Sequence, residues 1–398
     1  MWTQPVLISI CLLLLGAASA KQPADYDDIV KELEKLLLNS DPNINPSIEK
    51  LRKCDHESGE EARCVKKSLC KLAAPALDRS TQFEYRELIE GGCTYLQTCC
   101  PESQINLTNP SPPLNIQNVG CGYSNPGANV LRELASDNGY ADFGEFPWSV
   151  ALMKKNVPDA KFHDAYIGGG TLIDASVVLT VAHKIDEISA SNLKVRAGEW
   201  DTKTIEEAYP HQERNVKKII IHEEYIRLRA HYDFALVILE KPFDLNNSPH
   251  IGIACLDRSL PPPGTQCYSM GWGEDFKTAT HKYAEILKKV PLPLVDGNKC
   301  QNKYRNSKLG RTYNLHKTLT CAGGEPDVDT CLGDGGSSLV CPVPDKVGVR
   351  YSMVGMVVYG LGCGTDLPGV YAKVPEVYDW VQTKMVEEGF TTSSFKRD

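Results

Sequence analysis

The distribution of cysteine residues constrains the fold of this chain more than any other feature. Fifteen cysteines occur among 398 residues, and Cys11 lies in an apolar leading segment. The others form an even number in two separate sets, a pattern typical of disulfide frameworks in secreted proteins. The first set is Cys54, Cys64, Cys70, Cys93, Cys99 and Cys100. A segment this short buries too little apolar surface to fold alone, so three bridges would stabilise it by roughly 2 to 5 kcal/mol each.

Spacing alone does not choose among the many ways in which six cysteines can pair. A metal site is the alternative interpretation of the first set. Zinc sites usually contain close pairs of cysteines of a kind absent here, and thiols oxidise in secreted proteins, so disulfides are favoured and no metal is expected.

Residues 1–20 are predicted to be a signal peptide. An apolar run leads to Ala18-Ser19-Ala20, a small-x-small cleavage site, so the mature chain would begin near Lys21. A membrane anchor is the alternative, but the run is shorter than the roughly 20 residues that span a bilayer. The sequence therefore predicts a secreted, extracellular protein without a membrane segment.

The composition is that of a globular protein, with 42% apolar and 24% charged residues. The net charge of −8 argues against a nucleic-acid partner, because such proteins need a basic face that neutralises phosphates.

Two segments flank the first cysteine set. Residues 21–53 form an acidic leader, which either contains a short amphipathic helix or is solvated. Residues 101–134 form a linker rich in Pro, Asn and Ser. Asn106 lies in a glycosylation sequon within this linker. Asn246 lies in a second, weaker sequon, because Pro249 follows it.

From residue 121 the chain consists of short β-type segments separated by turn signals. The clearest are VVLTVAH, VKKIIIH, FALVIL and YSMVGMVV. Such spacing predicts an all-β barrel or sandwich, and the C-terminal EVYDWVQTKMVEE has helical periodicity.

Ordered motifs in residues 121–390 resemble those of trypsin-like serine proteases. They are FGEFPWSVAL, GGGTLI, VLTVAHKI, YDFALVIL, CYSMGWG, CAGG, CLGDGGSSLVC and PGVYAKV. The resemblance implies a mainly β domain at 135–390, built from two six-stranded barrels and a final helix, with a tail at 391–398. The first cysteine set, C-x9-C-x5-C-x22-C-x5-C-C, resembles an arthropod clip domain at 54–100.

The two resemblances also imply disulfide pairs. In the clip segment they are Cys54–Cys99, Cys64–Cys93 and Cys70–Cys100; in the larger domain they are Cys121–Cys255, Cys267–Cys341, Cys300–Cys321 and Cys331–Cys363. The family has a further bridge beside its catalytic histidine. Its two positions hold Gly168 and Lys184 here, so both halves are missing together.

The resemblance places His183 and Asp233 at two positions of a Ser/His/Asp triad. Gly335 occupies the third, and glycine has no oxygen that could attack a carbonyl. Ser337 and Ser338 lie nearby but are displaced from the serine position, so neither is expected to replace the nucleophile. The chain is therefore identified as similar to the inactive clip-domain serine protease homologues, and no catalysis is expected.

The specificity pocket of the family is partly retained. Asp329 occupies the position of the carboxylate that pairs with a basic side chain, and Gly360 and Gly369 match the pocket wall. Val358 and Tyr359 replace the family's Ser-Trp pair, which removes one donor to the triad aspartate. A relic basic-residue pocket is one interpretation of Asp329, and a surface carboxylate without consequence is the default.

The activation segment differs from that of active relatives. Their cleavage frees an Ile-Val-Gly-Gly terminus whose ammonium inserts beside the aspartate equivalent to Asp334, whereas residues 135–138 read ASDN here. Arg132 is a candidate cleavage site in an exposed segment. We expect cleavage to switch binding, with the Cys121 bridge holding both pieces together, and an oligomer could form afterwards.

Glu199, Glu206 and Glu207 lie where some relatives bind calcium, but a solvated acidic loop is favoured, so no cofactor is expected.

Three functions remain open at this stage. The leading hypothesis is a non-catalytic cofactor or regulator of a clip-protease cascade in arthropod haemolymph, acting with clip-domain proteases and prophenoloxidase in melanisation and innate immunity. The alternatives are an extracellular recognition or adhesion protein and an active protease with an unusual nucleophile.

Overall fold

The structure is a computed structural model that describes most of the region after residue 120 and part of the region before it. The described residues are 48, 51–56, 58–66, 70, 93, 97–105, 120–124, 139–157, 161–204, 207, 209–276, 283–345 and 350–397. The expected signal peptide, the possible leader helix and most of the linker lie outside them.

A small antiparallel sheet carries the first cysteine set. It comprises β1 (Lys53–Asp55), β2 (Glu61–Lys66) and β3 (Gln97–Pro101), with β2 in the middle, followed by the 3₁₀ helix η3 (Glu102–Gln104). The three disulfides are Cys54–Cys99, Cys64–Cys93 and Cys70–Cys100, the pairs that the clip resemblance implies.

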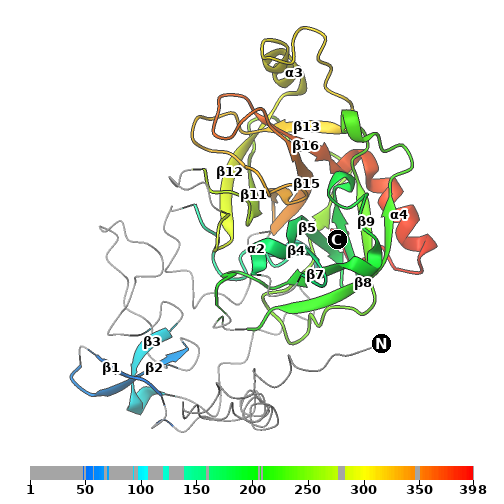
Figure 1. The fold of residues 1–398 in the computed structure, drawn as a ribbon. Coiled ribbons are helices and arrows are strands. Elements are labelled where there is room, and N and C mark those ends of the chain that lie inside the picture. The colour runs from blue at the N-terminus through cyan, green and yellow to red at the C-terminus, as the bar shows by residue number, and fades with distance from the viewer. Residues whose placement is uncertain are drawn as a thin grey trace, which may run out of the picture. The chain divides into compact units, whose positions relative to one another are not determined.

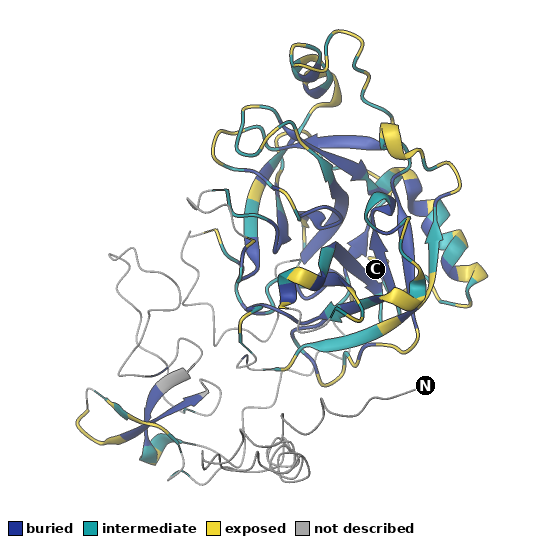
Figure 2. Ribbon diagram, in the orientation of Figure 1, coloured by how far each residue is buried: buried dark blue, intermediate teal, exposed yellow. Residues whose placement is uncertain are grey.

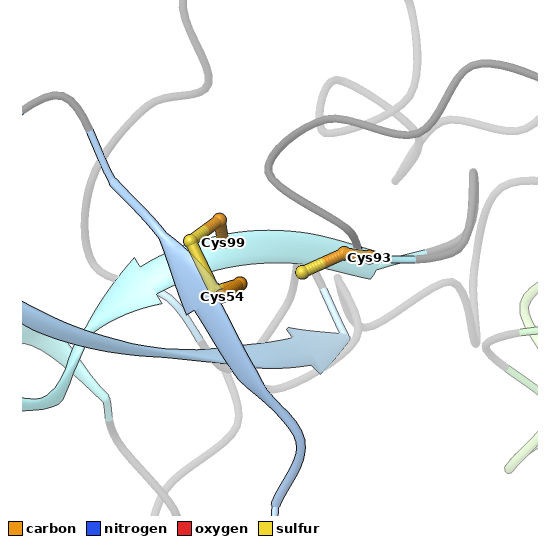
Figure 3. Close-up of side chains that lie close together, drawn as sticks. All are labelled: Cys54, Cys93 and Cys99. Carbon is orange, nitrogen blue, oxygen red and sulfur yellow. A yellow bond between two sulfur atoms is a disulfide. The ribbon is translucent and has the colours of Figure 1, made fainter.

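Cystines take the place of an apolar core in this sheet. Its buried cluster consists of Ala62, Cys64, Cys93 and Cys99. Figure 3 shows the Cys54–Cys99 bridge with Cys93 beside it. The sulfur of Cys93 is bonded to Cys64, so these close sulfur atoms all belong to disulfides and none is a thiolate that could ligate a metal.

Six strands form a closed barrel in the order β4-β5-β6-β9-β8-β7 (Figure 1). Their bounds are β4 Ser149–Lys154, β5 Tyr166–Asp174, β6 Val177–Thr180, β7 Leu193–Ala197, β8 Gln212–Ile221 and β9 Ala235–Leu239. β-Branched and aliphatic residues dominate the centre, and every residue of β6 and β9 is buried. The strands expected from VVLTVAH, VKKIIIH and FALVIL are confirmed.

A second six-stranded barrel closes through the pairing of β15 with both β14 and β16. Its order is β15-β14-β11-β12-β13-β16, and the short β10 adds in parallel to β15. The bounds are β10 Cys255–Leu256, β11 Gln266–Gly271, β12 Lys288–Val295, β13 Leu319–Ala322, β14 Ser338–Val343, β15 Arg350–Tyr359 and β16 Gly369–Lys373. The expected double barrel is therefore confirmed.

Helices lie around the barrels. They are α2 (Phe162–Ala165), α3 (Gly297–Arg305) and the C-terminal α4 (Tyr378–Glu387). Tyr378, Val381 and Met385 form the buried face of α4, which confirms the expected final helix. Beyond it, Phe395 is fully buried and its carbonyl accepts the Leu256 amide at 2.9 Å, so the last residues pack on the domain. Figure 2 shows the barrel strands mostly buried, with exposed residues in the connections.

Four disulfides stabilise the larger domain, and they are the pairs implied by the resemblance. They are Cys121–Cys255, Cys267–Cys341, Cys300–Cys321 and Cys331–Cys363. In the described part of the chain, none of the helices combines the length and apolarity needed to cross a bilayer.

The two barrels are in direct contact where β5 meets the loop of residues 331–337. The Gly169 amide donates to the Gly335 carbonyl at 3.0 Å. A Cβ on Gly169 would overlap Ser337 Oγ and lie 2.8 Å from Ser337 Cα. The GGG sequence of β5 is therefore required by close backbone packing rather than by a turn.

Candidate functional site

His183 and Asp233 meet because they follow and precede paired strands. Thr180 at the end of β6 pairs with Ala235 at the start of β9, so residues just after 180 and just before 235 lie at the same barrel end. His183 Nδ1 lies 2.6 Å from Asp233 Oδ2, and the His183 amide donates to Oδ1 at 2.9 Å. Asp233 is almost fully buried, while a quarter of the His183 side chain is exposed. This is the geometry of a general base held by a carboxylate.

Gly335 lies opposite the free edge of this imidazole. An ideal Cβ on Gly335 would lie 3.4 Å from His183 Nε2. Local hydrogen bonds fix its loop: the Asp334 amide donates to the Cys331 carbonyl at 3.0 Å, and the Ser337 amide donates to the Asp334 carbonyl at 2.9 Å. A side chain at position 335 would point at the base, but glycine supplies no hydroxyl there.

The two neighbouring serines face away from the base. Ser337 is 4% exposed and its Oγ packs against the backbone at Gly169 and Gly271. Ser338 is 1% exposed and its hydroxyl lies 3.0 Å from Met270 Sδ. Both are therefore shielded by barrel packing from any reacting group.

Lys184 fills the space that a serine side chain would need. A Cβ on Gly335 would overlap Lys184 Cε and lie 3.3 Å from its Nζ. A Cβ on Gly168 would lie 3.4 Å from both Cγ and Cε of the same lysine. The Lys184 stem therefore lies in van der Waals contact with Gly168, whereas the atom that excludes a side chain at Gly168 is the Gly335 carbonyl oxygen, 2.5 Å from an ideal Cβ. Burial lowers the pKa of the Lys184 ammonium, and the Asp334 carboxylate opposes this effect.

A buried ion pair holds the loop of residues 331–337 in place. Lys288 Nζ lies 2.8 Å from Asp334 Oδ2, and these side chains are 8% and 2% exposed. The Gly273 amide donates to Oδ1 at 2.8 Å and the Cys331 amide to Oδ2 at 3.0 Å. In a charge of this kind, pairing and hydrogen bonds offset the cost of burial. Asp334 therefore has a cation supplied from β12, within the same domain.

Asp329 is buried close to the same loop. It is 6% exposed, and it accepts the Gly364 amide at 3.2 Å and the Thr330 amide. Burial raises its pKa to about 6, because these hydrogen bonds only partly offset desolvation. The default interpretation of Asp329 as a surface carboxylate is therefore wrong.

The neighbours of Asp329 form a compact lining. Thr330 Oγ1 lies 3.2 Å from Tyr371 Oη, and the Tyr371 ring lies against Gly369. At Gly360 a Cβ would meet only the Gly362 carbonyl oxygen, at 3.4 Å. Gly364 and Tyr371 thus lie near Asp329, and Gly369 adjoins the Tyr371 ring; the specificity pocket itself stays a prediction.

Residues 139–381 match the family model described as Trypsin. The chain belongs to the trypsin family. Within it, the chain is a clip-domain serine protease homologue. "Phenoloxidase-activating factor 2" of Galleria mellonella is 43% identical over 301 residues, which are 73% of this chain and 96% of the relative. "Inactive CLIP domain-containing serine protease A8" of Anopheles gambiae is 35% identical over 293 residues, 72% of this chain and 77% of the relative. "Inactive CLIP domain-containing serine protease A28" of the same mosquito is 32% identical over 318 residues, 75% and 79% of the two chains.

The acidic residues considered for calcium are not solvated in this homologue. Glu199 and Glu207 are 6% and 4% exposed, which corrects the expected solvated loop; Glu206 lies outside the described residues. Arg196 Nη1 lies 2.8 Å from Glu199 Oε2. Burial and, to a lesser extent, the Glu199 carboxylate raise the pKa of Glu207 to about 7. The Arg196 guanidinium already compensates the charge of Glu199. The expectation that no calcium is bound here stays untested.

The expected modification sites fall in different parts of the homologue. Asn246 is exposed, but the Ser248 of its sequon is 7% exposed and its hydroxyl accepts Gln212 Nε2 at 2.7 Å. Asn106, Arg132 and residues 135–138 lie outside the described residues. Glycosylation and cleavage therefore stay predictions.

Sequence reasoning missed the roles of Lys288 and Lys184. The sequence showed that residues 135–138 lack the apolar activation terminus, but nothing in it singled out Lys288 as a cation for Asp334. Lys184 was noted only as half of a missing bridge. Its position over Gly335 depends on packing against Gly168, which only the fold reveals.

Proposed function

We propose that this secreted homologue is a non-catalytic cofactor or regulator of an extracellular clip-protease cascade that activates prophenoloxidase. One observation supports the proposal most strongly. The His183–Asp233 base is intact, but the residue that faces it is Gly335, which has no hydroxyl and is covered by the Lys184 stem. Loss of the nucleophile from such a triad costs on the order of 10⁶ in turnover, so binding is what such a site can still provide.

The cascade assignment is supported by similarity. The relative named phenoloxidase-activating factor 2 is matched over 96% of its length, and two further relatives are named inactive clip proteases. The disulfides of both modules are consistent with an oxidising compartment, and haemolymph is the proposed location. Clip-domain proteases and prophenoloxidase are the proposed partners.

Cleavage after Arg132 is proposed as the switch. The Lys288–Asp334 pair gives the loop of residues 331–337 a buried cation from within the domain. A new chain terminus is therefore not needed to hold that loop. Cleavage would then act on the linker and the clip module, whereas the Cys121–Cys255 bridge keeps the pieces together. Exposure of a binding surface or assembly into an oligomer is the proposed consequence.

The test is a reconstituted activation assay. Purified prophenoloxidase and its activating clip protease are mixed with the intact chain, with the chain cut in the linker, or with an Arg132→Gln variant exposed to the same cutting protease. Oxidation of dopamine is followed spectrophotometrically against a mixture that lacks the chain. We expect the cut form to change phenoloxidase activity and the Arg132→Gln form to behave like the intact chain. Unchanged activity with every form would move the assignment to extracellular recognition or adhesion.

A further inference from the structure

Three hydrogen-bond donors around Gly335 have no acceptor among the described residues. They are the backbone amides of Gly333 and Gly335 and the ammonium of Lys184. The turn that presents the amides is held by the Asp334 amide bond to Cys331, with Gly333 in the left-handed region at φ 93°. Buried or partly buried donors without a partner favour a ligand that brings acceptor oxygens.

The charges around these donors make the position cationic. Asp334 is the nearest acid that influences Lys184, but Lys288 already pairs with Asp334 at 2.8 Å. No carboxylate of the described residues lies within ion-pair distance of Lys184, so its positive charge is offset only in part, by the Asp334 carboxylate that Lys288 shares. His183 Nε2 borders the same point, 3.4 Å from the ideal Cβ position of Gly335. An anion placed over Gly335 would thus meet two amides and an ammonium, as well as the imidazole edge.

Asp329 favours a ligand group of the opposite charge, a cation. This carboxylate is 6% exposed, and no lysine, arginine or histidine of the described residues lies within ion-pair distance of it. Thr330 and Tyr371 lie beside it, and at Gly360, which the resemblance places in the pocket wall, a Cβ would meet only the Gly362 carbonyl oxygen. A cationic side chain next to Asp329 would relieve the cost of its burial.

We propose that this site binds the carboxyl terminus of a peptide that ends in arginine or lysine. The terminal carboxylate accepts hydrogen bonds from the Gly333 and Gly335 amides and pairs with Lys184, while the basic side chain extends to Asp329. An intact peptide bond presents a neutral carbonyl at the same place and gains nothing from the ammonium. The replacement of a cystine half by Lys184 thus converts a place for bond cleavage into one that distinguishes a cut chain end from an uncut one.

The ligand class fits the reaction that must supply it. Cleavage after a basic residue produces chains that end in arginine or lysine with a free carboxylate, and this source of ligand rests on the proposed function in a protease cascade. The binding chemistry itself depends only on Lys184, Asp329 and the loop amides.

Calorimetric titration of the full-length chain at pH 7.5 tests the inference. The probes are acetyl-Gly-Gly-Arg with a free carboxylate, the same peptide as its carboxamide, and acetyl-Gly-Gly-Leu with a free carboxylate. We expect the arginine acid to bind at least about tenfold more tightly than either of the other two, a difference of about 1.4 kcal/mol. Equal affinities for acid and amide, or binding of none of the three, would overturn the proposal.

Two variants separate the two halves of the site. Lys184→Met keeps an unbranched stem over Gly168 and removes the charge, so it should abolish the preference for acid over amide. Asp329→Asn should weaken both arginine peptides by about tenfold or more and leave that preference intact. Lys299→Met, at an exposed lysine of α3, is the matched control and should bind like the unaltered chain.

The outcomes also separate this inference from the proposed function. A Lys184→Met chain with an unchanged unfolding midpoint that still prefers the acid refutes the role of Lys184. Should that variant fail to fold, the comparison of acid and amide on the unaltered chain decides the matter alone. A chain that alters phenoloxidase activity but distinguishes none of the peptides would overturn the carboxylate site and leave the cascade role standing.

Discussion

The buried Lys288–Asp334 ion pair should contribute more than any other contact to the stability of the loop of residues 331–337. Lys288→Met removes the cation and leaves the Asp334 carboxylate, whose side chain is 2% exposed, with only the amide donors of Gly273 and Cys331. Breaking a buried pair in this way typically costs about 3 to 5 kcal/mol. For a domain of this size that corresponds to a fall in Tm of roughly 6 to 20 °C.

Equilibrium unfolding in guanidinium chloride measures this cost, with disulfides intact and tryptophan fluorescence as the signal. Lys299→Met, at an exposed lysine, is the control and should change the free energy of unfolding by less than about 0.5 kcal/mol. The double variant Lys288→Met/Asp334→Asn should regain much of the loss, since it removes both buried charges. A Lys288→Met variant as stable as the Lys299→Met control would refute the claim that an internal cation holds this loop.

Three further predictions follow from the site and its disulfides. A Gly335→Ser variant should hydrolyse an arginine ester at least about tenfold more slowly than the variant that also carries Lys184→Ala, because the new Cβ would overlap the Lys184 stem; equal rates would contradict this packing. Asp329→Asn should raise the unfolding free energy at pH 7.5 by at most about 3 kcal/mol and leave it unchanged at pH 4, since burial raises the native pKa to about 6. The native carboxyl keeps its proton to a higher pH than the unfolded one, so stability falls as pH rises from about 4 to about 6; a gain of the same size at pH 4 would contradict this assignment. After cleavage of the linker, the chain should migrate as one band on a non-reducing gel and as two after reduction, because Cys121–Cys255 joins the pieces; two bands without reductant would contradict the bridge.

The double barrel could be predicted from two kinds of evidence. The strands show local patterns of apolar residues, and the motifs follow one another in the order that the trypsin-like family has. Every residue of β6 and β9 is buried and all but Thr180 are apolar, and the pairing of these strands brings His183 to Asp233. The disulfides could be predicted because each cysteine lies at a position whose partner is known from the clip-domain or the trypsin-like resemblance. Gly335 was visible as a departure at one position of an otherwise familiar loop.

The remainder depends on tertiary contacts that sequence does not encode locally. Lys288 stands beside Lys289 in β12, yet only Lys288 reaches Asp334, whereas Lys289 pairs with Glu145. Lys184 lies over Gly335 because a side chain at position 335 would overlap the end of the lysine stem. Sequence suggested a solvated loop at Glu199, which instead lies buried against Arg196. For these lysines a group far along the chain decides where the side chain lies, whereas Glu199 is buried against a partner only three residues away.

An internal cation for Asp334 also changes how cleavage can act. In active members of the family, the resemblance links cleavage to a new ammonium beside this aspartate. Here β12 already supplies one, so the loop and the Asp329 region are held in the uncut chain. The proposed cleavage would then change the linker and leave the Asp329 region as it is.

The central claim, that this chain influences phenoloxidase activation without catalysis, is tested most directly in the reconstituted assay with chemically blocked protein. The linker-cut chain is treated with diisopropyl fluorophosphate, freed of excess reagent, and added to prophenoloxidase and its activating protease beside untreated cut chain. The account predicts no labelling of the chain by mass spectrometry and the same change in phenoloxidase activity from both preparations. Labelling of the chain together with loss of its effect after treatment would contradict it.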